Sequence, residues 1–152
     1  MPKAILVSAC LLGLNTRYSG QTKYNARVVE YLKHNDYIPV PVCPEQLAGL
    51  PTPRPASEFR SGDGRDVLDG RGQVRTREGV DVSSRFCNGA AETLKIADLA
   101  GCQTAILKER SPSCGVNWIY RQEKLVQGPG VTAALLQNHQ IAILSEEELP
   151  EF

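Results

Sequence analysis

Short apolar runs alternate with helix-forming segments along this chain, and that alternation limits its fold more than any other feature. Runs with the length of buried strands occur at residues 4–7 (AILV), 37–42 (YIPVPV), 104–107 (TAIL) and 141–144 (IAIL). Helical spacing predicts helices over 28–33, 84–100 and 130–138, the long one capped by Ser83 and stopped by Gly101. Alternating strands and helices predict an α/β fold of three layers, in which a mainly parallel sheet carries helices on both faces.

The remaining segments predict less regular structure. The two prolines of the 37–42 run favour a strand near the edge of the sheet, or pairing that ends early, because proline has no backbone N–H to donate to a neighbouring strand. Residues 51–72 are rich in Pro, Gly, Asp and Arg and predict a long irregular loop, and residues 80–82 predict a short strand or turn. A length of 152 residues with 41% apolar residues suits one domain, spanning residues 1–152.

The net charge and the hydropathy of the chain indicate whether it binds nucleic acid or a membrane. Lys and Arg (17) balance Asp and Glu (17), so no global field draws the chain toward nucleic acid or an anionic membrane. The apolar runs fall far short of the roughly 20 residues needed to span a bilayer. The start, MPKAILVS, is better interpreted as a first strand than as a signal peptide. We therefore expect a cytoplasmic protein with no membrane contact.

Three of the five cysteines follow predicted strands. Cys10 lies three residues after the first strand, Cys43 directly after the second, and Cys114 in the loop after the third. Ligands of such sheets bind beyond the carboxyl ends of the strands, so these three thiols are expected at one edge. Cys87, inside the long helix, and Cys102, just past its end, are expected to be ordinary core or helix-end residues. Disulfides are not expected in a reducing compartment, and an odd count fits them poorly.

Three convergent thiols are consistent with several kinds of site. Proline and glycine flank them, as they commonly flank iron–sulfur ligands, in the segments SACLLG, VCPE and SPSCG. Three thiolates leave one iron of a four-iron cluster open, as a Lewis acid for a soft sulfur atom. Spacing alone leaves three alternatives: a zinc ion with three cysteines and a water, a thiol-redox pair, and three unrelated thiols.

Several long motifs then occur in register: VSACLLG at 7–13, PVCPEQLAGLPTPRP at 41–55, GDGRDVLDG at 62–70, LKERSPSCG at 107–115 and GPGVTAALL at 128–136. With these motifs nearly the whole chain resembles the bacterial thiouracil desulfurase family. The resemblance implies a Rossmann-like three-layer sandwich that holds a 4Fe–4S cluster on three cysteines, which fall on Cys10, Cys43 and Cys114. It also implies removal of sulfur from a thiolated pyrimidine such as 2- or 4-thiouracil, giving uracil and hydrogen sulfide.

The resemblance further implies an acid beside the second cysteine, at Glu45, and a serine before the third, at Ser111. Glu45 would move protons in a partly desolvated pocket; the alternative is an acid that favours a helix N-terminus. Ser111 would orient the substrate or relay a proton, with Ser113 as the alternative, although either could merely stabilise a turn. Arg54, held between two prolines, is expected to position a polar substrate group.

The predicted activity is that of a desulfidase, an enzyme that hydrolyses a carbon–sulfur bond without an external reductant. The substrate sulfur would bind the iron that lacks a cysteine. The alternative is a non-catalytic iron–sulfur or zinc-binding module, such as a sulfide carrier or redox sensor. The expected partner is a small-molecule thiolated base; balanced net charge disfavours a thiolated tRNA as a tight partner. Trp118 and Tyr120 would either stack on the base or pack in the core.

Overall fold

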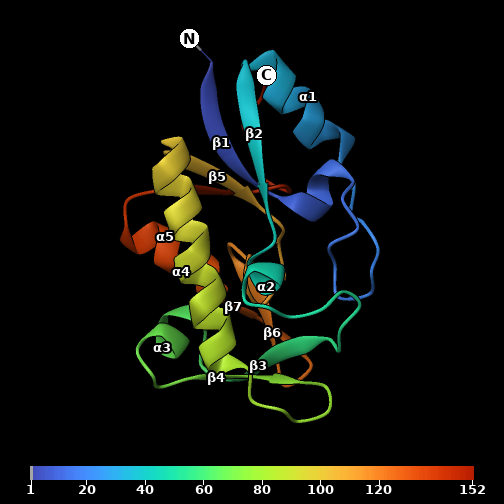
Figure 1. The fold of residues 1–152 in the computed structure, drawn as a ribbon, viewed down its shortest axis with the longest axis vertical. Coiled ribbons are helices and arrows are strands. Elements are labelled where there is room, and N and C mark those ends of the chain that lie inside the picture. Colours follow the sequence, from blue (N-terminus) through green and yellow to red (C-terminus); the bar gives the residue numbers. More distant parts are fainter. Residues whose placement is uncertain (1) are drawn as a thin grey trace.

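A four-stranded parallel sheet forms the centre of the protein. A computed structural model describes residues 2–152 (Figure 1). The strand order is β2-β1-β5-β8, formed by β1 (Lys3–Ser8), β2 (Tyr37–Val42), β5 (Thr104–Leu107) and β8 (Ala142–Ser145). The predicted strands and the edge position of the proline-containing β2 are confirmed.

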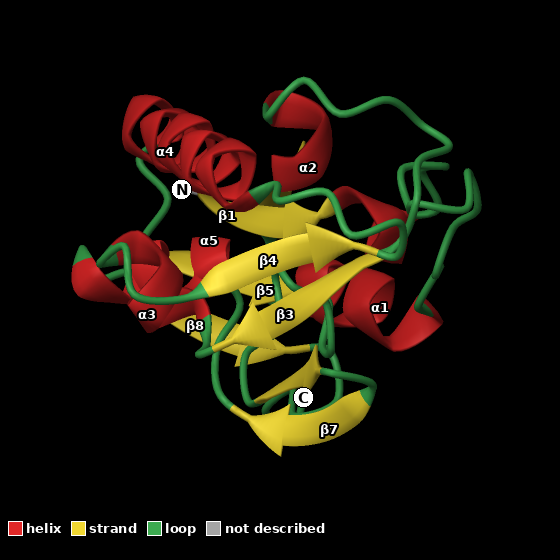
Figure 2. Ribbon diagram, turned by 90° about the horizontal axis from the view of Figure 1, so that it is seen from below, coloured by secondary structure: helices red, strands yellow, loops and turns green. Residues whose placement is uncertain are grey.

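Helices cover both faces of this sheet. Because side chains alternate along a strand, Ile5 and Val7 pack on one face, in a cluster with residues of α1 (Ala26–His34). Leu6 points to the other face and packs with residues of α4 (Ser83–Ala100) and α5 (Val131–Asn138). Figures 1 and 2 show α4 and α1 at different sides of the parallel strands. The prediction of an α/β fold with three layers and a mainly parallel sheet is confirmed.

A second sheet was not predicted from the sequence. Its order is β4-β3-β6-β7, formed by β3 (Ser57–Ser61), β4 (Gln73–Thr76), β6 (Trp118–Arg121) and β7 (Lys124–Gln127). Strands β3 and β6 are parallel, whereas both outer pairs are antiparallel. Figure 2 shows this sheet in front of the parallel one. It packs through a separate apolar cluster that includes Phe59, Val74, Phe86 and Ile119.

The prediction of an irregular loop over residues 51–72 is therefore wrong in part, because β3 and α3 (Gly64–Leu68) lie inside it. In β3 only Phe59 is fully buried among polar neighbours, so the sequence carries too little alternation to reveal a strand. Helix α3 depends on a capping box, in which the side chains of Asp63 and Asp66 bond each other's backbone N–H. In residues 80–82, the only regular pairing is a bridge from Asp81 to Arg75.

Short elements after the parallel strands place the cysteines. Cys10 lies in the 3-10 helix η1 (Ala9–Leu12), and Cys43 is the residue before α2 (Pro44–Leu47). Gly89 of α4 allows α2 to approach, since a β-carbon there would lie 2.1 Å from the Pro44 carbonyl oxygen. Gly130, which precedes α5, similarly admits the backbone of Ser113. Within residues 2–152, no helix has the length and apolar character required to cross a bilayer.

Candidate active site

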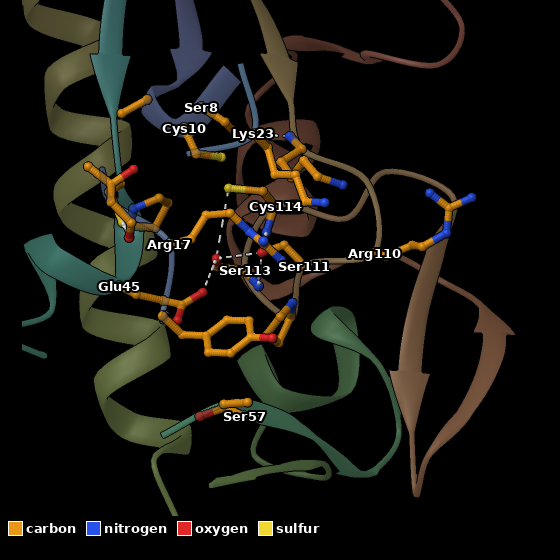
Figure 3. Close-up of a pocket in the computed structure, with 18 of the residues that line it drawn as sticks. Ser8, Cys10, Arg17, Lys23, Glu45, Ser57, Arg110, Ser111, Ser113 and Cys114 are labelled. Carbon is orange, nitrogen blue, oxygen red and sulfur yellow. Dashed lines mark hydrogen bonds between the residues drawn. The ribbon is translucent and has the colours of Figure 1, made fainter. Parts of the chain in front are cut away.

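A cavity of about 500 Å³ lies beyond the carboxyl ends of β1, β2 and β5 (Figure 3). Its lining includes Cys10, Cys43, Cys114, Glu45 and Ser113. The three thiols that were predicted to share one edge of the sheet therefore share one cavity. Figure 3 shows the sulfur atoms of Cys10 and Cys114 turned toward each other. Parallel strands bring these residues together because their carboxyl ends all reach the same edge.

The thiols are close enough to influence one another electrostatically. Burial raises the pKa of the Cys10 thiol to about 11; the Lys108 ammonium opposes this rise and the Cys43 thiol adds to it. Burial also raises the pKa of Cys114 to about 12, where a hydrogen bond to Ser8 acts against it and Cys10 and Cys43 add to it. The buried thiols of Cys10 and Cys114 therefore stay protonated at neutral pH unless a metal stabilises their thiolates.

The other two cysteines lie elsewhere. Cys102 is buried in the core cluster between the parallel sheet and α4. Cys87 is half-buried on α4, where its sulfur lies 3.8 Å from the Val67 carbonyl oxygen. Neither lines the cavity. Their location agrees with the prediction that both are ordinary core or helix-end residues.

Glu45 and two serines form a hydrogen-bonded chain at the cavity wall. The Ser113 hydroxyl donates to Glu45 Oε2 at 2.9 Å, and its oxygen lies 3.0 Å from Ser111 Oγ. Because Ser113 gives its single hydroxyl proton to Glu45, the bond between the two hydroxyls is donated by Ser111. Figure 3 shows this chain between Glu45 and Ser111, below the Cys114 sulfur. Ser113, which sequence reasoning ranked behind Ser111, is therefore the serine in direct contact with the acid.

Ser111 also organises the loop that carries the third cysteine. Its hydroxyl oxygen accepts the backbone N–H groups of Ser113, at 3.2 Å, and of Cys114, at 3.0 Å. This arrangement is a serine-centred turn of the kind that the sequence offered as the alternative role. Ser111 thus combines a structural role with a place at the far end of the chain that leads to Glu45.

The cavity is locally basic although the chain is neutral overall. Six cationic side chains line it, against three carboxylates: Arg17, Lys23, Arg54, Arg77, Lys108 and Arg110, against Glu45, Glu58 and Glu109. Lys108 is paired with Glu146 at 3.1 Å. An excess of cations around three cysteines suits a group whose bound thiolates bring negative charge.

Comparisons with known proteins agree with this geometry. A sequence model of the 2-thiouracil desulfurase family matches residues 5–148. The chain belongs to this family. It is 40% identical over 148 residues to the uncharacterized protein YbbK of Bacillus subtilis strain 168, covering 95% of this chain and 97% of that one. It also resembles the solved structure of a [4Fe-4S]-dependent thiouracil desulfidase, TudS, with a TM-score of 0.83 and 39% identity, over 97% of this chain and 93% of that one.

Membership of the 2-thiouracil desulfurase family confirms the resemblance drawn from the five motifs. Tyr120 lines the cavity, whereas Trp118 is not among its lining residues. Arg54, expected to hold a polar substrate group, instead directs its guanidinium to partners within the chain, among them Glu45 at 3.0 Å.

Sequence reasoning missed Glu109, a buried acid of the Cys114 loop. Its side chain is 2% exposed and accepts three backbone hydrogen bonds, at 2.8 to 3.0 Å, from Val116, Asn117 and Trp118. Burial alone would raise the pKa of Glu109, but these backbone N–H groups outweigh it and hold the pKa below its usual range. The signal in the sequence is a charged residue placed directly between a buried strand and a cysteine loop.

Replacing Glu109 with glutamine should destabilise this member of the 2-thiouracil desulfurase family by about 3 kcal/mol, because charged acceptors of buried N–H groups are strong and an amide can satisfy only some of them. For a chain of this length the melting temperature should fall by roughly 10 °C at pH 7. Since the pKa is lowered in the folded state, the carboxylate stabilises the fold above about pH 4.3, the ordinary value of Glu, and loses this effect as pH falls further.

The difference in melting temperature between wild type and Glu109→Gln should therefore shrink in acid. The control is Glu92→Gln, which removes an exposed carboxylate paired with Lys95 and should shift the melting temperature little. A Glu109→Gln variant as stable as wild type at pH 7 would show that the Cys114 loop is held by other contacts.

Proposed function

We propose that this protein is an iron–sulfur-dependent desulfurase that acts on a small thiolated pyrimidine such as 2- or 4-thiouracil. The observation that carries the proposal is the convergence of Cys10, Cys43 and Cys114 in one cavity beside Glu45. Membership of the 2-thiouracil desulfurase family and the likeness to a [4Fe-4S]-dependent thiouracil desulfidase support it. The reaction is a hydrolysis: water provides the oxygen of the new carbonyl, and the sulfur leaves as hydrogen sulfide.

The residues present fit a 4Fe–4S cluster. Three thiols, soft ligands preferred by iron–sulfur clusters, face one cavity that also carries an excess of cations. Within residues 2–152, no group of three or more His, Cys, Asp or Glu side chains is arranged to hold one metal ion. Ligands of a single metal ion gather around one point, as at a zinc site with sulfur atoms about 3.8 Å apart. Cysteines of a cluster each bind a different iron atom, so their thiols need not meet at a point.

Cys10, Cys43 and Cys114 would hold the cluster. When bound, a cluster with three cysteine ligands supplies one open iron, a Lewis acid for the thiocarbonyl sulfur of the substrate. Serine hydroxyls adjoin the third thiol: Ser113 Oγ lies 3.8 Å from the Cys114 sulfur.

Glu45 and its serines would handle protons. Glu45 takes one proton from the attacking water and delivers it to the ring nitrogen that is unprotonated in the thiolate form of the pyrimidine, and the second water proton leaves with the sulfur. The Ser113 hydroxyl donates to Oε2 of the Glu45 carboxylate at 2.9 Å, and this bond fixes the orientation of the carboxylate. Ser111 donates to Ser113 and so provides a second step along which a proton can move or a substrate oxygen can be held. Ser111 is thus part of the proposed site, and Ser113 links it to the acid.

The cavity suits a small planar substrate. Its volume of about 500 Å³ lies within the usual range for small-molecule pockets. Tyr120 lines it and offers an aromatic face, while Ser57 of β3 offers a hydroxyl group. A free thiolated base is therefore the proposed substrate class, ahead of a thiolated tRNA.

Anaerobically reconstituted protein should release uracil and sulfide from 2- or 4-thiouracil in equal amounts. The assay contains no added reductant, so release of both products would show that the reaction is a hydrolysis and requires no reductant. Iron and acid-labile sulfide, measured on the same sample, should each approach four per chain, as a 4Fe–4S cluster requires. Both products are measured by chromatography and by a colorimetric sulfide assay.

Three results would contradict the proposal. Zinc without labile sulfide would identify a zinc-binding module. An intact cluster without turnover of either thiouracil would leave a sulfide carrier or redox sensor as the function. Turnover of a thiolated tRNA but not of the free bases would overturn the proposed substrate class.

A further inference from the structure

The Arg54 guanidinium is buried at the rim of the thiol cavity and has all of its hydrogen-bond donors engaged. Its side chain is 5% exposed. Arginine has five N–H donors, and five acceptors surround this one. They are Glu45 Oε1 at 3.0 Å, the Pro51 carbonyl at 3.2 Å, Thr52 Oγ1 at 2.9 Å, the Thr16 carbonyl at 3.0 Å and the Cys43 sulfur at 3.8 Å. No donor is left over for a substrate.

Two of these partners belong to the proposed chemistry. The Nε–H bonds the carboxylate of Glu45, and an Nη2–H bonds the sulfur of Cys43. Glu45 is thus held on both sides, by Arg54 on Oε1 and by Ser113 on Oε2. A single planar cation therefore connects a thiol to the acid two residues along the chain.

The other three partners hold the guanidinium itself. Pro51 and Thr52 belong to the segment just before Arg54, whereas Thr16 lies in the loop between η1 and α1. Because these bonds use separate N–H groups, the orientation of the guanidinium is set before any ligand arrives. Fixed donors give a preorganised environment, which costs no rearrangement when charge develops in the cavity.

We propose that Arg54 is a positioning residue of the desulfurase, one that aims Glu45 at the substrate and donates a charge-assisted hydrogen bond to the thiolate of Cys43. The inference rests on the proposed function. The two effects can be measured separately, because the Nε–H of Arg54 donates to the carboxylate of Glu45 and an Nη2–H donates to the sulfur of Cys43. Loss of the first impairs proton transfer. Loss of the second makes reduction of the bound cluster harder, since hydrogen bonds to ligand sulfur favour the more negative state.

A double-mutant cycle tests the first effect. Arg54→Gln should lower kcat about tenfold or more in the wild-type background while KM changes less than about twofold, because Arg54 contacts no substrate. In the Glu45→Gln background the same change should lower the remaining kcat less than about twofold, since there is no acid left to aim. Equal losses in both backgrounds would overturn the positioning role, and so would a rise in KM that accounts for the whole loss.

Redox titration of the cluster tests the second effect and does not depend on activity. The midpoint potential of the cluster should be lower in Arg54→Gln than in the wild type. Adding Arg54→Gln to the Glu45→Gln variant should lower the potential of that variant by the same amount. Arg71→Gln is the matched control, because Arg71 pairs with Asp69 on the surface and its side chain is 70% exposed. That variant should leave both kcat and the potential unchanged. An unchanged potential in Arg54→Gln would overturn the bond to Cys43.

If Arg54→Gln does not fold, Arg54→Lys replaces it in the kinetic and the redox experiments. Lysine keeps the charge on one nitrogen and cannot reproduce a fork that reaches an acid and a sulfur at once. It should lower kcat in the wild-type background only, and lower the midpoint potential, in the same pattern as glutamine. Full rescue of both by lysine would overturn the inference. A wild-type protein that binds no cluster would instead overturn the proposed function, so the two failures are distinguishable.

Discussion

Replacing Cys114 with serine should abolish release of sulfide from thiouracil and remove most of the bound iron. Cys114 is 4% exposed, and the Cys10 and Cys43 thiols lie close enough to raise its pKa. A serine oxygen is a harder and far more basic ligand than a thiolate, so a cluster left with two cysteines should not survive purification. We expect iron to fall from about four atoms per chain to below one, with activity lowered at least about 1,000-fold. Metal analysis and the visible absorption of the cluster measure the loss.

The matched control is Cys87→Ser, at a half-buried thiol on α4 that does not line the cavity. Its iron content and its activity should remain those of the wild type. Cys10→Ser and Cys43→Ser should behave as Cys114→Ser does. A Cys114→Ser variant that keeps its full cluster, or a colourless Cys87→Ser variant, would show that a different set of cysteines binds the metal.

Glu45→Gln should lower kcat by about 100-fold or more while the cluster stays in place, because general acid–base groups contribute factors of this size. The amide is nearly the same shape as the carboxylate, and its oxygen can still accept from Arg54 or from Ser113, the two donors found at 3.0 and 2.9 Å. What the variant loses is the ability to take a proton from water. Steady-state kinetics with 4-thiouracil, together with iron content and absorption, separates this loss from loss of the cluster.

Glu58→Gln is the matched control for Glu45→Gln, since Glu58 is a second carboxylate of the cavity lining and bonds the backbone N–H of Glu123. Its kcat should stay within about threefold of the wild type. If Glu45→Gln retains wild-type kcat with a full cluster, the acid serves only to hold Arg54 and the N-terminal end of α2. The proton would then have to move through another group.

The parts of the fold that were predictable from sequence are those with a strong local pattern. β1 and β5 are uninterrupted apolar runs, and the residues that follow them carry turn signals, so their carboxyl ends were evident. The second sheet was not evident, because a strand such as β3 buries only Phe59 and depends on partners far along the chain. Pairing between β3 and β6 joins residues about 60 positions apart, which no local window can detect.

The sequence by itself determined the α/β class, the edge at which three of five cysteines gather, and, through its long motifs, the family. These properties follow from local periodicity and from the order of elements along the chain. Only the tertiary structure decided that Ser113 bonds Glu45 and that the Arg54 guanidinium bonds Glu45 and Cys43. Such roles depend on which atoms lie within hydrogen-bonding distance after folding. Glu45 and Ser113 are 68 residues apart, and the close packing of α2 on Gly89 of α4 and of the Ser113 backbone on Gly130 helps to bring them to 2.9 Å.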